Sequence, residues 1–268
     1  MGVDKEYLME SEDEFYRLDI KTEVTTVQKR ALWAGLKPGM RVADLGCGSG
    51  KTSSVLHELV GSAGETVGVD FADNRISFAR ENYKADGLSF QCRDVREDMS
   101  DLGKFDFVWM RFVLEYYLAE SFDIVEKVTR LLKPGGILCL IDLDYNCLTH
   151  FGISDRMERT LQALVTALRE RANFDAYVGR KIYTYMYDLG MTDIQVDVGG
   201  HHVIYGQLAE SDAFNWTKKV EVAPGKIQFD FSEYPGGHEE FMEEFRTVFN
   251  DPRRFTYSPI IICRGQKA

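Results

Sequence analysis

The residues best suited to chemistry form a glycine-rich loop, VADLGCGSGKT, at positions 42–52. Glycines directly after a strand let the backbone turn tightly and approach a ligand, and a following helix offers free N–H groups. Two phosphate-binding patterns do not fit this loop. A P-loop requires G-x-x-x-x-G-K-[ST], and Leu45 stands where its first glycine belongs. A dinucleotide fingerprint requires G-x-G-x-x-G, and Lys51 stands at its third glycine.

Two aspartates follow the loop at the ends of predicted strands. Asp70 closes the strand predicted over residues 65–70, where an acid can accept hydrogen bonds from both hydroxyls of a ribose. Asp94 follows the strand predicted over residues 88–92. Ligands of open α/β sheets bind outside the carboxyl ends of the strands. We therefore expect the loop and both acids to share one crevice.

Over residues 37–143 this combination resembles the class I methyltransferases, which use S-adenosylmethionine. The resemblance rests on Asp44 before the G-x-G-x-G loop, on Asp70 and Asp94, and on the turn LLKPGG at 131–136. It implies that the loop passes under the methionine part of the cofactor. It also implies that Asp94 and the next backbone N–H meet the adenine. The cofactor expected is S-adenosyl-L-methionine, and its predicted binding residues are Gly46, Cys47, Gly48, Gly50, Asp70, Phe71, Asp94 and Val95.

Two arginines are further candidates for binding the cofactor. An arginine offers a bidentate fork to a carboxylate, such as that of the methionine. Arg111, after the fourth predicted strand, would contact the cofactor or a substrate carboxylate, or would form a salt bridge at the start of a helix. Arg17 precedes the core, and the alternative for it is a solvated surface position.

The segment after the fourth predicted strand narrows the choice of acceptor. Members of the family that methylate planar amides or exocyclic amines often carry Asn/Asp-Pro-Pro-aromatic there, and this chain has Met110-Arg111-Phe112-Val113. Arg111 also stands where a metal-dependent catechol enzyme needs a carboxylate. Asp142, Asp144 and Asn146 could imitate only the second half of such a site, so no metal is expected.

The candidates for a general base follow the expected ends of strands. They are His201, His202, His150 and Tyr145. His201 ranks first because it follows Gly199-Gly200, where the chain can turn back over the crevice; the alternative is a solvent-facing loop histidine. Neither paired carboxylates nor a nucleophile–base pair can be read from the sequence, so we expect catalysis mainly by positioning.

The elements that must position these residues alternate between strands and helices. Apolar runs predict strands, and amphipathic spacing predicts helices between them. This alternation predicts an α/β fold with a doubly wound, mostly parallel seven-stranded sheet and helices on both faces. The predicted strands are residues 41–45, 65–70, 88–92, 105–110, 137–142, 192–198 and 259–263, and the early helices are 51–60, 74–83 and 121–132.

Two long segments, near residues 146–180 and 200–256, interrupt the alternation and predict helical cover insertions over the crevice. Helices are expected there at 154–171, 180–189, 210–219 and 238–249. The predicted organisation is an N-terminal helical cover (1–36), a cofactor-binding core (37–145), and the last strands with the cover insertions (146–268). Aromatic residues in the irregular segments would suit an apolar pocket; they are Phe174, Tyr177, Tyr183, Tyr185, Tyr205 and Trp216.

Composition argues against several classes of partner. The formal net charge of −11 disfavours nucleic acid, because an acidic surface repels phosphates. The longest apolar stretch, 137–143, contains Asp142 and is too short to span a membrane. Five widely spaced cysteines without a CxxC pair favour a reducing cytoplasm. A homodimer is compatible with the sequence.

These observations predict methyl transfer from S-adenosylmethionine to a small-molecule acceptor at oxygen, nitrogen or carbon, without a metal. Two alternatives stay open at this point. One is a protein methyltransferase, since an acidic surface suits a basic protein tail. The other is a module that binds the cofactor without catalysis.

Overall fold

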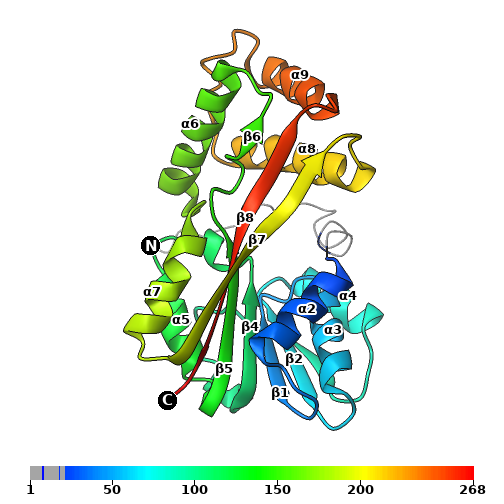
Figure 1. The fold of residues 1–268 in the computed structure, drawn as a ribbon, viewed down its shortest axis with the longest axis vertical. Helices are drawn as coiled ribbons and strands as arrows, with labels where there is room; N and C mark the ends of the chain where they lie inside the picture. Colours follow the sequence, from blue (N-terminus) through cyan, green and yellow to red (C-terminus); the bar gives the residue numbers. More distant parts are fainter. Residues whose placement is uncertain (1–7, 9–17, 19–21) are drawn as a thin grey trace.

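A computed structural model describes Leu8, Leu18 and residues 22–268 of the chain. Arg17 and most of the predicted N-terminal cover lie outside the described residues. From Thr22 onward the chain enters helix α2 (Val24–Ala34) and then the central sheet (Figure 1).

The central sheet has the strand order β3-β2-β1-β4-β5-β8-β6, and β7 pairs with the other edge of β8. The first five strands run parallel, whereas β8 runs antiparallel to both β5 and β7. The seven predicted strands are all present, and a two-residue strand, β6, is added. The bounds are β1 (Arg41–Leu45), β2 (Glu65–Asp70), β3 (Leu88–Cys92), β4 (Phe105–Arg111), β5 (Leu132–Leu143), β6 (His150–Phe151), β7 (Thr192–Tyr205) and β8 (Phe255–Gln266).

Helices cover both faces of this sheet, as predicted for a doubly wound fold (Figure 1). Phe107 and Trp109 of β4 pack toward α2 and α3, whereas Val108 and Met110 of the same strand pack toward α5. Side chains that alternate along a strand bury both faces, which explains why β4 reads as a continuous apolar run. The helices are α3 (Lys51–Val60), α4 (Asp73–Asn82), α5 (Ser121–Thr129) and α7 (Ile182–Asp188), with short 3-10 turns η1 (Ser100–Leu102), η2 (Leu114–Tyr116) and η3 (Val178–Lys181).

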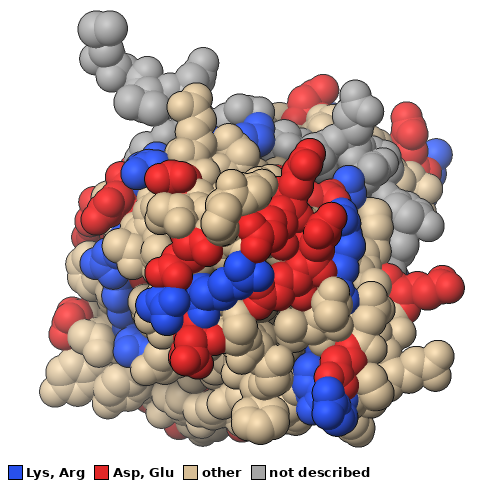
Figure 2. Space-filling model, turned by 90° about the horizontal axis from the view of Figure 1, so that it is seen from above, with Lys and Arg blue, Asp and Glu red and all other residues tan. Residues whose placement is uncertain are grey.

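The two irregular segments form a cap beyond the carboxyl ends of the parallel strands (Figure 1). The cap consists of α6 (Asp155–Ala172), α8 (Glu210–Lys226), α9 (Gly237–Asn250), β6 and the adjoining ends of β7 and β8. It has an apolar core of its own, in which Trp216 and Phe245 are almost fully buried. Figure 2 looks down on the cap, where acidic and basic side chains lie side by side, and Arg156 and Arg159 form ion pairs with glutamates there.

The last two strands are longer than predicted, which corrects the expected position of His201. Gly199 and Gly200 do not end β7, because their backbone pairs with Ile260 and Pro259 of β8. His201 therefore lies within β7 rather than in a loop after it, opposite Ser258. The register of β7 against β8 shifts after it, between His201 and Ile204, as it does near the start of the strand, between Thr192 and Gln195.

Helix ends also differ from the sequence-based expectation. α5 ends at Thr129 because Leu132, expected in the helix, already pairs with Phe105 in the sheet. α8 runs to Lys226 instead of Lys219 and accommodates Pro224 near its end. Within the described part of the chain, no helix is long and apolar enough to cross a membrane.

Candidate functional site

The glycine loop between β1 and α3 forms the floor of an open pocket with an empty volume of about 870 Å³, here called the loop pocket. Gly46 and Gly48 have positive φ angles of 76° and 55°. The N–H groups of Gly46 and Cys47 both donate to the carbonyl of Val69, 2.7 and 2.9 Å away, which ties the loop to β2. A Cβ on Gly46 would lie 2.3 Å from Val113 Cγ2. Glycine at position 46 therefore leaves a space that any other side chain would occupy.

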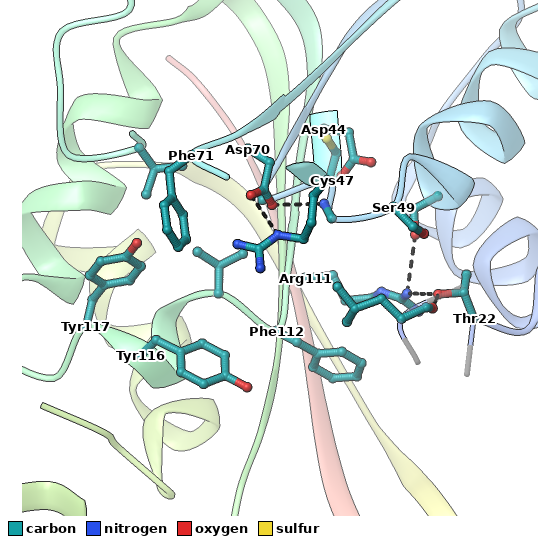
Figure 3. Close-up of a pocket in the computed structure, with 17 residues that line it drawn as sticks. Thr22, Asp44, Cys47, Ser49, Asp70, Phe71, Arg111, Phe112, Tyr116 and Tyr117 are labelled. Atoms are coloured by element: carbon teal, nitrogen blue, oxygen red, sulfur yellow. Dashed lines mark hydrogen bonds and ion pairs between the residues drawn. The ribbon is translucent and has the colours of Figure 1, made fainter. Parts of the chain in front are cut away.

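Most of the residues predicted to bind a cofactor line this pocket. Figure 3 shows Asp70 and Phe71 on one side of it and Arg111 with Thr22 on the other. The predicted residues that line it are Gly46, Cys47, Gly48, Asp70, Phe71, Val95 and Arg111.

Gly50 and Asp94 are not among the lining residues. Gly50 precedes α3 in a left-handed conformation, and a Cβ there would lie 2.7 Å from Ala79 and 2.9 Å from Phe90. Its smallness therefore serves the packing of α4 and β3. Asp94 accepts hydrogen bonds from the backbone and guanidinium of Arg96. Burial raises the pKa of Asp94, but the hydrogen bonds from Arg96 together lower it by more. The pKa of Asp94 therefore lies below its ordinary value.

Asp70 is held by a partner that the sequence did not reveal. Its carboxylate accepts hydrogen bonds from Gly48 N–H (3.0 Å), Ala72 N–H (3.0 Å) and Arg75 Nε (3.1 Å). The ion pair with Arg75 is almost fully buried, with side-chain exposures of 3% for Arg75 and 8% for Asp70. Arg75 also lines the loop pocket. The acid at the end of β2 therefore fixes both the loop and a buried cation.

We expect Asp70→Ala to lower the free energy of unfolding by about 3–5 kcal/mol, because it removes a buried carboxylate that pairs with the buried guanidinium of Arg75. Urea unfolding of the parent and the variant measures this difference. Asp73→Ala, which changes an exposed acid of α4, serves as the control. A loss below about 1 kcal/mol, the value of a surface ion pair, would show that the pair does not behave as buried.

Arg111 is the last residue of β4 and not the first residue of a helix. Its guanidinium donates to the hydroxyls of Thr22 (3.1 Å) and Thr52 (3.2 Å). Burial lowers the pKa of Arg111 to about 10, and the negative charge of Asp44 partly offsets that effect. Burial also raises the pKa of Asp44 to about 6, against the hydrogen bond from Ser53. A cation beside the glycine loop is thus available to an anionic group in the pocket.

A second pocket, here called the cap pocket, lies between the sheet and the cap and has an empty volume of about 780 Å³. Phe112 and Tyr116 line both this pocket and the loop pocket, so they form a shared wall. Most of its lining is apolar. It comprises Leu8, Phe112, Glu115, Tyr116, Leu143, Asn146, Cys147, Leu161, Leu164, Val165, Leu168, Phe174, His201, His202, Trp216, Lys219, Val220 and Ala223.

The four candidate bases lie in different surroundings. His201 and His202 line the cap pocket, and the ring of His201 lies 4.9 Å from that of Phe112 and 3.9 Å from that of His202. Tyr145 is 44% exposed and packs against Tyr177 instead. Of the aromatic residues considered from the sequence, Phe174 and Trp216 line the cap pocket. The tyrosines of that set line neither the loop pocket nor the cap pocket; they are Tyr177, Tyr183, Tyr185 and Tyr205.

His150 is a half-buried residue whose ring is held by neighbouring polar groups. Its ring nitrogens lie 2.9 Å from Thr256 Oγ1 and 3.1 Å from the carbonyl of Cys147. Burial lowers the pKa of His150 to about 4, against the hydrogen bond that the ring can donate to the Cys147 carbonyl, which favours the charged ring. The folded protein therefore holds this ring neutral where an unfolded chain would protonate it.

We expect the parent to lose about 3 kcal/mol of stability at His150 as the pH falls from 6.5 to about 4, because the unfolded state takes up the proton first. His150→Gln should remove this part of the acid sensitivity. Urea unfolding of both proteins at neutral and acidic pH gives the two differences. Equal losses in parent and variant would contradict the assignment of a neutral buried ring.

No group of three or more His, Cys, Asp or Glu side chains is arranged for a metal among the described residues. The three residues that could have imitated half of a metal site have other partners. Asp142 accepts from the backbone N–H groups of Leu114 and Leu143, Asp144 pairs with Arg180, and Asn146 donates to Glu115.

Comparison with known proteins agrees with this geometry. A family described as a methyltransferase domain matches residues 36–190, which is more than half of the chain. The chain belongs to the class I methyltransferase family. This match includes the lining of the loop pocket apart from Leu18 and Thr22, and it includes α6 of the cap.

Two relatives and one solved structure illustrate how far this family likeness extends. A demethylmenaquinone methyltransferase of Bacillus cytotoxicus is 29% identical over 136 residues, 46% of this chain and 56% of that protein. A chloroplastic 2-phytyl-1,4-beta-naphthoquinone methyltransferase of Arabidopsis thaliana is 33% identical over 119 residues, 42% and 45% of the two chains. The chain thus matches about half the length of these methyltransferases.

A crystal structure of a Bacillus halodurans protein, described as a methyltransferase, has the same fold. It is 15% identical with a TM-score of 0.56, and the likeness covers 91% of this chain and 99% of that one. At this level of identity the comparison shows a shared fold alone.

Proposed function

We propose that this methyltransferase binds S-adenosylmethionine in the loop pocket and transfers its methyl group to an apolar small molecule in the cap pocket. The observation that carries this proposal is the shared wall. Phe112 and Tyr116 line both pockets, so a cofactor and an acceptor would meet there. In this organisation residues 37–145 bind the cofactor, and the later segments close over it and select the acceptor.

The loop pocket fits S-adenosylmethionine in shape and in charge. Gly46 and Gly48 leave a cradle that a Cβ would fill, since it would lie 2.3 Å from Val113 or 3.0 Å from Leu18. Asp70 offers a carboxylate oxygen to the ribose, and Arg75 holds that carboxylate in place. Phe71 and Val95 supply apolar surface for an adenine. Arg111 supplies the cation for the methionine carboxylate at the other end.

The cap pocket suits an acceptor with an aromatic or acyl body. Helices α6 and α8 contribute four lining residues each, and the large aromatic side chains are Phe112, Tyr116, Phe174 and Trp216. The relatives are named for naphthoquinone substrates, which are apolar ring systems with long chains. We therefore propose a naphthoquinol-like acceptor, a class that fits the mostly apolar lining.

In this proposal the chain catalyses the transfer mainly by positioning. The bound cofactor supplies an electrophilic methyl group on a positively charged sulfur. Phe112 and Tyr116 orient the acceptor against that methyl group, and the cap excludes water. Alignment of two reactants is worth about 7–11 kcal/mol in favourable cases. No metal is needed, because Arg180 already neutralises Asp144 and Arg111 occupies the place of a metal-binding carboxylate.

His201 lines the cap pocket, and its proposed role is that of a wall residue, with proton removal as the alternative raised by the sequence. Its ring packs between Phe112 and His202. We expect His201→Ala to slow single-turnover methyl transfer less than about fivefold and to leave its pH profile unchanged, because a general base contributes about 10²–10⁴-fold. A loss of a hundredfold with a changed profile would assign the base to His201.

The experiment that tests the proposed function follows tritium from methyl-labelled S-adenosylmethionine into extracted products. The acceptors offered are a reduced 2-polyprenyl-1,4-naphthoquinone, a simple catechol and a basic histone-tail peptide, all in chelator. We expect label in the naphthoquinol, with one S-adenosylhomocysteine formed for each product. Label only in the peptide would favour a protein methyltransferase. Cofactor binding with no label in any acceptor would favour a non-catalytic module.

A further inference from the structure

Three polar side chains form a connected group in the mostly apolar cap pocket, which His201 and His202 also line. Glu115, in the turn η2 after β4, and Asn146, after β5, are each only 4% exposed. Asn146 Nδ2 donates to Glu115 Oε2 over 2.7 Å. On its other side, Asn146 Oδ1 accepts from Lys219 Nζ of α8 over 3.4 Å. One amide thus stands between a carboxylate and an ammonium, and all three residues line the pocket.

The ammonium of Lys219 is held at the pocket by groups from two elements. It lies 4.8 Å from the centre of the Trp216 ring and 3.8 Å from Cys147 Sγ. Both of these residues line the cap pocket. Lys219 is half-buried, so its stem can pack along the apolar lining while its ammonium stays hydrated at the pocket. The position of Lys219 is therefore suited to an anionic group of a bound molecule.

Glu115 is coupled to a second buried acid that the sequence did not pair with it. Asp142, at the end of β5, is 1% exposed and accepts hydrogen bonds from Leu114 N–H (3.0 Å) and Leu143 N–H (2.9 Å). Burial raises the pKa of Asp142 well above its ordinary value, and the negative charge of Glu115 raises it further. Repulsion between two buried acids favours a state in which one of them is protonated. This pair of acids can therefore retain a proton that is transferred to Glu115.

The group lies next to the wall shared with the cofactor site. Glu115 is the neighbour of Tyr116, which lines both pockets, and lies three residues after Phe112, which also lines both. An acceptor that contacts Glu115 and Lys219 therefore reaches the wall where the methyl group would arrive.

We propose that Glu115 takes the proton from an acidic hydroxyl of the acceptor, and that Lys219 holds the resulting oxyanion. This inference rests on the proposed function and adds two catalytic residues to it. The O–H bond breaks, and its proton passes to the carboxylate of Glu115. The electron pair of the anion then forms the bond to the methyl group at oxygen or at the conjugated carbon. The sulfur–methyl bond breaks, and its pair stays on the now neutral sulfur.

The test uses 1-naphthol as a probe, because its neutral and ionised forms absorb at different wavelengths. It is titrated into the full chain saturated with S-adenosylhomocysteine, below the pH at which free 1-naphthol ionises. We expect the bound probe to absorb as naphtholate in the parent protein. Calorimetry in two buffers of different ionisation enthalpy should show no net proton release, because Glu115 keeps the proton.

Two variants separate the two roles, and a third serves as the matched control. Lys219→Met should raise the pKa of bound 1-naphthol by about 1–3, so that it binds in its neutral form. Glu115→Gln should still bind naphtholate but release about one proton per probe to the buffer. Lys218→Met should behave as the parent. This control changes the preceding lysine of α8, whose ammonium lies 3.6 Å from the carboxylate of Glu221.

Several outcomes would overturn the inference. These are neutral 1-naphthol bound to the parent, equal affinity for 1-methoxynaphthalene and 1-naphthol, no binding of either compound, or the same proton count in Glu115→Gln as in the parent. The S-adenosylhomocysteine titration of the same samples distinguishes this failure from failure of the proposed function. A protein that binds the cofactor product and labels an acceptor, yet fails these tests, would keep the function and lose only the roles of Glu115 and Lys219.

Discussion

Gly46→Ala is expected to weaken the binding of S-adenosylmethionine at least tenfold, a loss of about 1.4 kcal/mol or more. Two effects add at this position. The backbone has a φ of 76°, which costs an alanine about 1–2 kcal/mol. The new Cβ would also lie 2.3 Å from Val113 Cγ2, and Val113 lines the same pocket. The side chain that must move is therefore part of the cofactor site. Calorimetric titration of parent and variant measures the loss.

Gly61→Ala is the matched control for this prediction. Gly61 has a similar φ of 69°, but no atom lies within 4 Å of a Cβ placed there. Alanine at this position should reduce stability through backbone strain and leave cofactor affinity unchanged. If both variants bound the cofactor as the parent does, the loop pocket would not be the cofactor site.

Phe112→Ala is expected to slow methyl transfer about a hundredfold, because a displacement of about 1 Å between reactants costs that much. Phe112 lines both pockets and is held with a positive φ of 58°, an uncommon conformation for a bulky residue. The position of its ring between Arg111 and His201 fixes the wall at which the reactants meet. Equal losses in kcat and kcat/KM would show that the wall acts in the transition state.

Phe122→Ala controls for the loss of an aromatic ring elsewhere. Phe122 of α5 is 37% exposed and packs against Tyr185, away from both pockets. Its replacement should leave the transfer rate unchanged. A higher KM for Phe112→Ala with an unchanged kcat would contradict a positioning role and assign Phe112 to acceptor affinity alone.

The core of this fold was predictable because each of its signals is local. The first three strands and α3 have their predicted bounds, since apolar runs of five or six residues end at Gly, Asp or Cys-Arg-Asp. The glycine loop and Asp70 were found in the same way. The glycines and Asp70 each stand at a fixed spacing from the end of a predicted strand, so the spacing alone identifies them.

The ends of β7 and β8 were not predictable from local signals. Gly199-Gly200 reads as a turn, and only the pairing with β8 keeps it in a strand. Arg75 illustrates the same limit in the site. It reads as one polar residue of an amphipathic helix, and only the packing of α4 against β2 brings it to Asp70. Glu115 and Asp142, 27 positions apart, meet because β4 and β5 are neighbours in the sheet. Lys219, from a helix of the cap, contacts Asn146, which in turn donates to Glu115.

The central claim is that the loop pocket binds S-adenosylmethionine, and calorimetric titration with S-adenosylhomocysteine in chelator tests it most directly. We predict one site per chain, and a loss of affinity of at least tenfold in Gly46→Ala but not in Gly61→Ala. A titration without binding heat for S-adenosylhomocysteine or S-adenosylmethionine, together with saturable binding of NADH, would contradict the account.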